Sequence, residues 1–128
     1  MCVTLSVLIV DDSRSFLDAA RDLLERQGVR IVGLVSSSAE ALRQAAELHP
    51  EVILIDITLA GESGFDLARQ LAVQRRGAAV MILISTHPQA DFADLIEESP
   101  AAGFLSKSEL SAGAIRQIAG GMPGAHVR

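Results

Sequence analysis

The chain has 128 residues, of which 49% are apolar, and it carries a formal net charge of −5 and one cysteine. This length suits one domain with one substantial core, and the negative charge argues against direct nucleic-acid binding, which normally needs a basic stripe. The lone Cys2 excludes an internal disulfide and fits a reducing compartment, so we expect a cytoplasmic protein. We expect neither a signal peptide nor a membrane contact, because no apolar run approaches the roughly 20 residues that span a bilayer.

Strand-like and helix-like patterns alternate along the first half of the chain. An apolar run at residues 7–10 predicts a strand, and Ser13 suits the cap of a helix that ends at Gln27 and Gly28. Residues 29–35 predict a second strand, and the helix after it is ended by Pro50. The apolar faces of these helices are expected to carry Phe16, Ala20, Leu23 and Leu24 in the first, and Leu42, Ala45, Ala46 and His49 in the second.

The second half continues the alternation with three more strands. Residues 52–55 predict a third strand, which leads through a polar loop at 58–64 into a helix ending near Gly77. Residues 80–84 predict a fourth strand, and His87 and Pro88 open a short helix after it. A fifth strand at 103–106 precedes a final helix that ends at Gly120 and Gly121. The apolar residues of these helices are Phe65, Ala68, Leu71 and Ala72, then Phe92, Leu95 and Ile96, and finally Leu110, Ala114, Ile115 and Ile118.

This alternation predicts an α/β fold, a doubly wound sheet of five parallel strands with five helices. Apolar runs without polar alternation fit strands that are buried on both faces. Five strands suggest the flavodoxin-like order 2-1-3-4-5, which places the first and third strands side by side. We expect residues 1–121 to form this domain, and residues 122–128 to be a C-terminal tail or the start of a linker.

Polar residues follow the apolar runs of four predicted strands: Asp11 and Asp12, Asp56, Ser85, and Lys107. Ligands of such sheets bind beyond the carboxyl ends of the strands, so these side chains are expected at one edge. The adjacency of the first and third strands brings three carboxylates together, and their repulsion calls for a counter-charge. Mg²⁺ binds one or two carboxylates together with water and phosphate oxygens. The edge therefore suits a Mg²⁺ ion and a phosphoryl group.

Each of these residues also has an ordinary structural interpretation when it is taken alone. Asp12 suits a cap of the first helix, Asp56 a turn, and Lys107 a solvated loop. Ser85 or Thr86 is expected to cap the fourth helix in addition to any other role. Chance does not readily place all of these residue types at one edge of a sheet, so we prefer the interpretation as a site.

With Gly64 in the loop after Asp56, these elements resemble the receiver domains of response regulators, the phosphoacceptor half of two-component signalling. The resemblance extends from Ser6 to Ala119, and its specificity lies in the ordered set of elements rather than in any single one. It implies a domain that is not an enzyme and that accepts a phosphoryl group from a sensor histidine kinase or a phosphotransfer protein.

The resemblance also implies a role for each site residue. Asp56 is the expected nucleophile and phosphorylation site, and Lys107 is the expected partner of a phosphoryl oxygen. Asp12 and Asp56 are expected to ligate Mg²⁺, with Asp11 acting mainly through water. Thr58 is expected to contribute its backbone carbonyl to the same ion.

A conformational switch is implied as well. Ser85 is expected to donate a hydrogen bond to the attached phosphoryl group, and Phe104 to turn into the space that opens behind it. This movement would change the surface of the fourth helix, fifth strand and fifth helix, which would act on a partner, form a homodimer or control an attached transcriptional output domain. Taken alone, Phe104 is an ordinary core residue.

Three positions depart from the common family pattern. Ser108 follows Lys107 where a proline after a cis bond is frequent, so we expect a trans bond or a strained one. Ala60 replaces a frequent proline, which should leave the loop after Asp56 less stiff. Thr86 is bulkier than the usual residue and is expected to crowd access to the phosphoryl group.

Other functions of the same fold stay open on the sequence. A Mg²⁺-dependent aspartyl-phosphate hydrolase of the haloacid-dehalogenase type would need an acid/base Asp at the position of Thr58. A flavin-binding electron carrier would need a phosphate loop after the first strand, where Asp11 and Asp12 would repel the phosphate. A docking module that is never phosphorylated would need none of the site residues, and their presence makes it the weaker interpretation.

Overall fold

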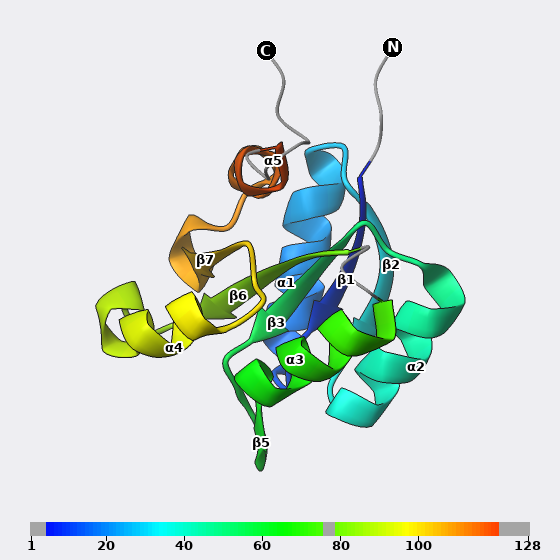
Figure 1. Cartoon of the computed structure of the whole chain (residues 1–128). Helices are drawn as coiled ribbons and strands as arrows, with labels where there is room; N and C mark the ends of the chain where they lie inside the picture. The colour runs from blue at the N-terminus through cyan, green and yellow to red at the C-terminus, as the bar shows by residue number, and fades with distance from the viewer. Residues whose placement is uncertain (1–4, 76–78, 121–128) are drawn as a thin grey trace.

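The computed structural model describes residues 5–75 and 79–120, so the predicted helix ends at Gly77 and Gly121 lie outside the described residues. Strands and helices alternate along these residues, and 3₁₀ turns precede α4 and α5 (Figure 1). The strands are β1 (Ser6–Val10), β2 (Arg30–Val35), β3 (Val52–Asp56), β4 (Thr58–Leu59), β5 (Glu62–Ser63), β6 (Val80–Ser85) and β7 (Gly103–Ser106). The helices are α1 (Arg14–Arg26), α2 (Ser38–Leu48), α3 (Gly64–Arg75), α4 (Ala93–Glu98) and α5 (Ala112–Gly120), with the 3₁₀ turns η1 (Gln89–Phe92) and η2 (Lys107–Glu109).

Five strands form one parallel sheet in the order β2-β1-β3-β6-β7. Because β4 and β5 form a separate antiparallel pair, the sheet strands follow the order 2-1-3-4-5 when they are numbered along the chain. The predicted doubly wound α/β fold with five helices is therefore confirmed. The interpretation of residues 58–64 as a plain loop is wrong, because the chain turns back there as a two-stranded hairpin.

Helices cover both faces of the sheet, with α1 behind it and α3 in front of it in Figure 1. The core on the side of α1 and α5 includes Leu24 and Ile115, whereas the core on the other side includes Ala45 from α2 and Leu71 from α3. All five residues of β3 are buried, which explains why the four residues before Asp56 are apolar and do not alternate with polar ones. Among the helices within the described residues, none combines the length and the apolar character that a membrane crossing requires.

The buried face of α1 is rotated relative to the prediction. Leu17 and Leu24 are almost fully buried, whereas Leu23, which was expected in the core, is 36% exposed. Residues 17, 20 and 24 follow one another by three and four positions and so share one side of the helix, while Leu23 lies about 100° away from Leu24. Leu110 is buried as predicted, but it precedes α5 and does not belong to it.

The predicted cap of α1 is confirmed, and the structure shows how α2 ends before Pro50. Ser13 caps α1, because its hydroxyl accepts the Phe16 N–H at 3.3 Å. His49 ends α2 in the left-handed conformation with φ 50°, and its N–H donates to the Ala45 carbonyl at 3.1 Å. The Ser13 cap fixes where the chain enters α1, directly after the aspartates that follow β1, and His49 fixes where the chain leaves α2.

Candidate functional site at the carboxyl edge of the sheet

The carboxyl ends of four strands meet at one edge of the sheet. Val10 of β1 lies beside Ile55 of β3, and Ser85 of β6 lies beside Ser106 of β7. The chain positions at or just after these strand ends therefore come together, and they are occupied by Asp11, Asp12, Asp56, Ser85 and Lys107.

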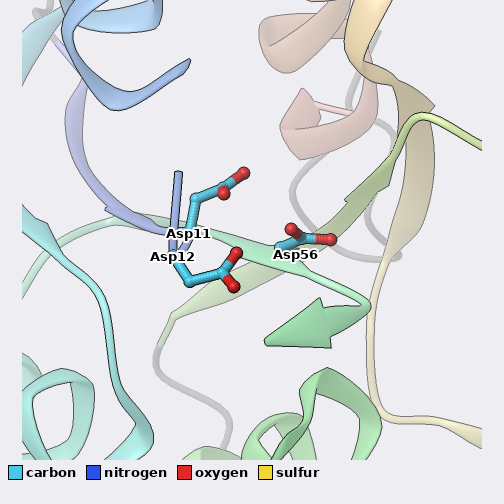
Figure 2. A group of neighbouring side chains, drawn as sticks. All are labelled: Asp11, Asp12 and Asp56. Atoms are coloured by element: carbon cyan, nitrogen blue, oxygen red, sulfur yellow. The ribbon is translucent and has the colours of Figure 1, made fainter. Parts of the chain in front are cut away.

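Three carboxylates lie at the centre of this edge (Figure 2). One oxygen from each of Asp11, Asp12 and Asp56 lies within 4.8 Å of the others. Asp11 is fully buried and Asp56 nearly so, whereas Asp12 is exposed. The predicted clustering is confirmed. The alternative that Asp12 caps α1 is wrong, because Ser13 is the cap, and Asp11 Oδ1 in turn accepts the Ser13 N–H at 2.8 Å.

Lys107 is the only lysine in the chain, and its ammonium lies among these carboxylates. Its Nζ is 2.6 Å from Asp11 Oδ2 and 3.3 Å from Asp56 Oδ2, and its side chain is only 14% exposed. Burial lowers the pKa of Lys107, but the contact with Asp11 and the negative charge of Asp56 more than offset this, so the pKa lies above the usual 10.5. The alternative of a solvated loop lysine is wrong. Every peptide bond in the described residues is trans, including the one between Lys107 and Ser108.

The two carboxylate oxygens of Asp56 have different partners. Oδ1 accepts the backbone N–H of Thr58 at 3.1 Å, and Oδ2 accepts from Lys107 Nζ. Burial raises the pKa of Asp56 above the usual 3.8, as does the charge of Asp11, and the hydrogen bonds from Thr58 and Lys107 offset this only in part. Three carboxylates face one ammonium, so their negative charge is only partly compensated, and their oxygens could hold a metal ion.

Ser85 and Phe104 occupy the neighbouring strands. Ser85 is buried at the end of β6, and its hydroxyl accepts the His87 N–H at 3.0 Å. The prediction that Ser85 or Thr86 caps the next helix is wrong, since neither η1 nor α4 has a side-chain cap. Phe104 of β7 is half-buried and packs against the core on the side of α2 and α3, as its ordinary structural interpretation predicts.

Gly64, the first residue of α3, lies against the backbone around Asp56. Its N–H donates to the Ile57 carbonyl at 2.8 Å, and a Cβ at this position would overlap the carbonyl oxygen of Asp56. No side chain fits here unless the backbone moves. The chain at the end of the hairpin of β4 and β5 is therefore packed tightly against the backbone of Asp56.

One contact of the site was not predicted. Lys107 Nζ lies 4.4 Å from the centroid of the Phe16 ring, a residue that the sequence pattern assigned only to the apolar face of the first helix. The sequence does contain one indication, because Phe16 is the fourth residue after Asp12 and lies in the first turn of α1. The start of that helix borders the same edge of the sheet.

Comparison with known protein families agrees with this arrangement. The model of the response regulator receiver domain family matches residues 7–119. The chain belongs to this family. The match includes every strand of the parallel sheet, together with the aspartates, Ser85 and Lys107 of the edge. The resemblance inferred from the sequence is confirmed, and the chain is a receiver domain of two-component signalling.

Individual relatives show which kinds of protein contain a similar segment. A Pseudomonas aeruginosa protein whose name assigns it to transcriptional regulation is 36% identical over 80% of this chain and 49% of its own length. Protein-glutamate methylesterase/protein-glutamine glutaminase 5 of Myxococcus xanthus is 28% identical over 79% of this chain and 29% of its own length. A two-component response regulator of the LuxR family from Aurantimonas has a crystal structure with a TM-score of 0.83 and 30% identity, covering 93% of this chain and 87% of that one. The chain spans half or less of the length of these curated relatives.

Proposed function

We propose that this receiver domain accepts a phosphoryl group on Asp56 from a phosphohistidine of a sensor histidine kinase or a phosphotransfer protein. The observation that carries the proposal is the placement of Asp56 between two further carboxylates and the ammonium of Lys107, at the carboxyl edge of the sheet. Phosphoryl transfer needs mainly positioning and charge stabilisation, and this edge supplies both. The domain acts as an acceptor and is not an enzyme with a substrate of its own.

The donor set fits Mg²⁺. Three carboxylate oxygens approach one another, and within the described residues the close partner of the buried Asp11 Oδ2 is Lys107 Nζ, at 2.6 Å. Asp12 and Asp56 would hold the ion directly, Asp11 mainly through water, and Thr58 through its backbone carbonyl. A bound Mg²⁺ would neutralise charge on the attacking carboxylate and on the phosphoryl oxygens.

Lys107 and Ser85 would act on the phosphoryl group once it is attached. Lys107 Nζ already lies 3.3 Å from Asp56 Oδ2, so a phosphoryl oxygen on Asp56 would be within reach of a small movement of its side chain. The Ser85 hydroxyl oxygen accepts the His87 N–H, and its own O–H would donate to a second phosphoryl oxygen. This new hydrogen bond is a candidate trigger for movement of Phe104 and of the surface formed by α4, β7 and α5.

We propose that this surface controls a partner or an output domain, with a homodimer through the same surface as one mode of action. A transcriptional output agrees with the names of the Pseudomonas and Aurantimonas relatives, while the methylesterase shows that a receiver of this kind also occurs with another output. The acidic charge supports an output that does not require this domain to touch nucleic acid. We assign residues 1–121 to the receiver and residues 122–128 to a tail or the start of a linker.

The hydrolase and electron-carrier alternatives are less well supported. Thr58 lacks the carboxylate that a dehalogenase-type enzyme would need two residues after its nucleophile, and its N–H is engaged with Asp56. Membership of the receiver family also argues against both alternatives. A docking module without phosphorylation remains the second candidate, and the experiment below separates it from the first.

Incubation with acetyl phosphate and Mg²⁺ should add one phosphoryl group, detected by intact-mass spectrometry and removed by hydroxylamine. Asp56→Asn should abolish the addition, because an amide is not a nucleophile of this kind. Asp66→Asn is the matched control, since Asp66 is an exposed carboxylate on α3 and should be labelled like the parent protein. Equal labelling of the Asp56→Asn protein, or no labelling of the parent, would contradict the proposal.

A further inference from the structure

Among the described residues, two carboxylates and one aromatic ring lie close to the Lys107 ammonium. It lies 2.6 Å from Asp11 Oδ2, 3.3 Å from Asp56 Oδ2 and 4.4 Å from the centroid of the Phe16 ring. A cation within about 6 Å of a ring centroid is attracted by the negative face of the aromatic system. Because the lysine side chain is largely buried, this attraction is weakened little by water.

Phe16 is held in place from its own side. Its N–H donates to the Ser13 hydroxyl, which fixes the first turn of α1, and its half-buried side chain packs against the core beneath α1 and α5. Lys107 approaches from the opposite side of the edge, at the start of η2 after β7. The aromatic contact therefore joins two residues that are 91 positions apart, and one of them, Lys107, also contacts Asp56.

The Phe16 ring attracts the ammonium in a different way from the two aspartates. Asp11 and Asp56 hold Lys107 through their charges, but these charges are also the ones that a metal ion and a phosphoryl group would engage. The ring carries no net charge, so it holds the ammonium without neutralising it and does not compete for a metal. When Asp11 and Asp56 engage a metal ion or a phosphoryl group, their attraction for Lys107 changes. The attraction of the Phe16 ring for Lys107 stays the same.

We propose that Phe16 is a positioning residue for Lys107, which keeps the ammonium beside Asp56 while the carboxylates exchange their partners. Lysine has a flexible four-carbon stem, so without the ring its ammonium would sample positions away from the site. The part of this proposal that concerns phosphoryl transfer rests on the proposed function. The part that concerns the placement of the ammonium does not.

The sole lysine makes the placement directly measurable. In protein grown with ¹³C-labelled lysine, the ε-methylene resonances belong to Lys107 alone. Ring currents should move them upfield in the parent and in Phe16→Tyr, and they should move to the position of a free lysine in Phe16→Leu and in Phe16→Met. Resonances that are unchanged in both apolar variants would overturn the proposal, because Lys107 would then not lie over the ring. Thermal melts of each variant confirm that the compared proteins are folded.

The rate of phosphorylation tests whether this placement of the Lys107 ammonium matters for phosphoryl transfer. Phe16→Leu should slow phosphorylation by acetyl phosphate about threefold to tenfold, in line with the strength of such contacts at partly desolvated sites, and Phe16→Tyr should restore the rate. In a Lys107→Met background, Phe16→Leu should have no effect, because its partner is already gone. The same slowing in both backgrounds, or a Phe16→Leu rate equal to that of the parent, would overturn the positioning role. If the parent itself is not phosphorylated, the proposed function fails, while the resonances still decide the placement of Lys107.

Discussion

Replacing Lys107 with methionine should destabilise the metal-free protein, because it leaves a buried charge without a counter-charge. Asp11 is fully buried, and among the described residues Lys107 Nζ, at 2.6 Å, is the close partner of its Oδ2. Asp11 Oδ1 accepts the Ser13 N–H at 2.8 Å, and this hydrogen bond should persist in the variant. Methionine has nearly the same length and apolar stem as lysine, so the packing of the site is largely kept while the ammonium is removed.

The expected loss is about 2 to 4 kcal/mol in the free energy of unfolding. Breaking a fully buried ion pair on one side costs about 3 to 5 kcal/mol, and the partial exposure of Lys107 reduces that figure. The total free energy of unfolding of a small domain is about 5 to 15 kcal/mol, so the loss would be a substantial part of its stability.

Urea denaturation at pH 7 in the presence of a chelator measures this loss directly. Arg43→Met is the matched control, because it removes an exposed cation from α2 and should change stability by no more than about 0.5 kcal/mol. The double variant Lys107→Met/Asp11→Asn should recover most of the loss, since the unpaired charge is then absent. Mg²⁺ should stabilise Lys107→Met more than it stabilises the parent, because the ion supplies the missing positive charge.

A Lys107→Met protein as stable as the Arg43→Met control would refute this reasoning. It would mean that water reaches Asp11 readily and that the short distance to Lys107 contributes little. Failure of the double variant to recover stability would also contradict it, because the cost would then lie in packing around position 107 and not in the unpaired carboxylate.

Three further predictions follow from the geometry around Asp56. Gly64→Ala should cost about 1 to 3 kcal/mol in urea denaturation, because its Cβ overlaps the carbonyl oxygen of Asp56, whereas Gly120→Ala, which meets no atom within 4 Å, should be tolerated. In the metal-free protein, Asp56→Asn should gain stability relative to the parent as the pH rises. The folded state raises the pKa of Asp56 above 3.8, so the parent loses stability between 3.8 and that raised pKa, and equal pH profiles would contradict this. Ser85→Ala should cost about 1 kcal/mol by leaving the His87 N–H without its acceptor, and it should reduce the amide NMR shifts that beryllofluoride and Mg²⁺ cause in β7; undiminished shifts would remove Ser85 from the switch.

Much of the site could be predicted from the sequence, because the strands of a parallel sheet can be arranged in only a few ways. Strands that are buried on both faces must be apolar throughout, so β3 stands out in the sequence and its end marks Asp56. Right-handed crossovers then leave few strand orders, and the one observed brings β1 beside β3. The clustering of Asp11, Asp12 and Asp56 follows from these two facts alone.

The division of roles within the cluster could not be predicted in this way. Asp11 and Asp12 are neighbours of the same chemical type, yet the first is fully buried and the second is exposed. Their difference depends on where α1 and the connection after β7 cover the edge, which no local pattern encodes. The pairing of Lys107 with Asp11 joins residues that are 96 positions apart, and it is set by the packing of the whole domain.

The sequence by itself therefore determined the five strands of the parallel sheet, their order and the residues that meet at the edge, because hydrophobic periodicity and chain connectivity act locally and leave few solutions. The tertiary structure alone decided that Leu23 faces solvent, that Ser85 binds the His87 N–H, and that Phe16 lies against Lys107. These outcomes depend on the rotation of a helix and the direction of individual side chains, and both are fixed only when the layers pack against each other.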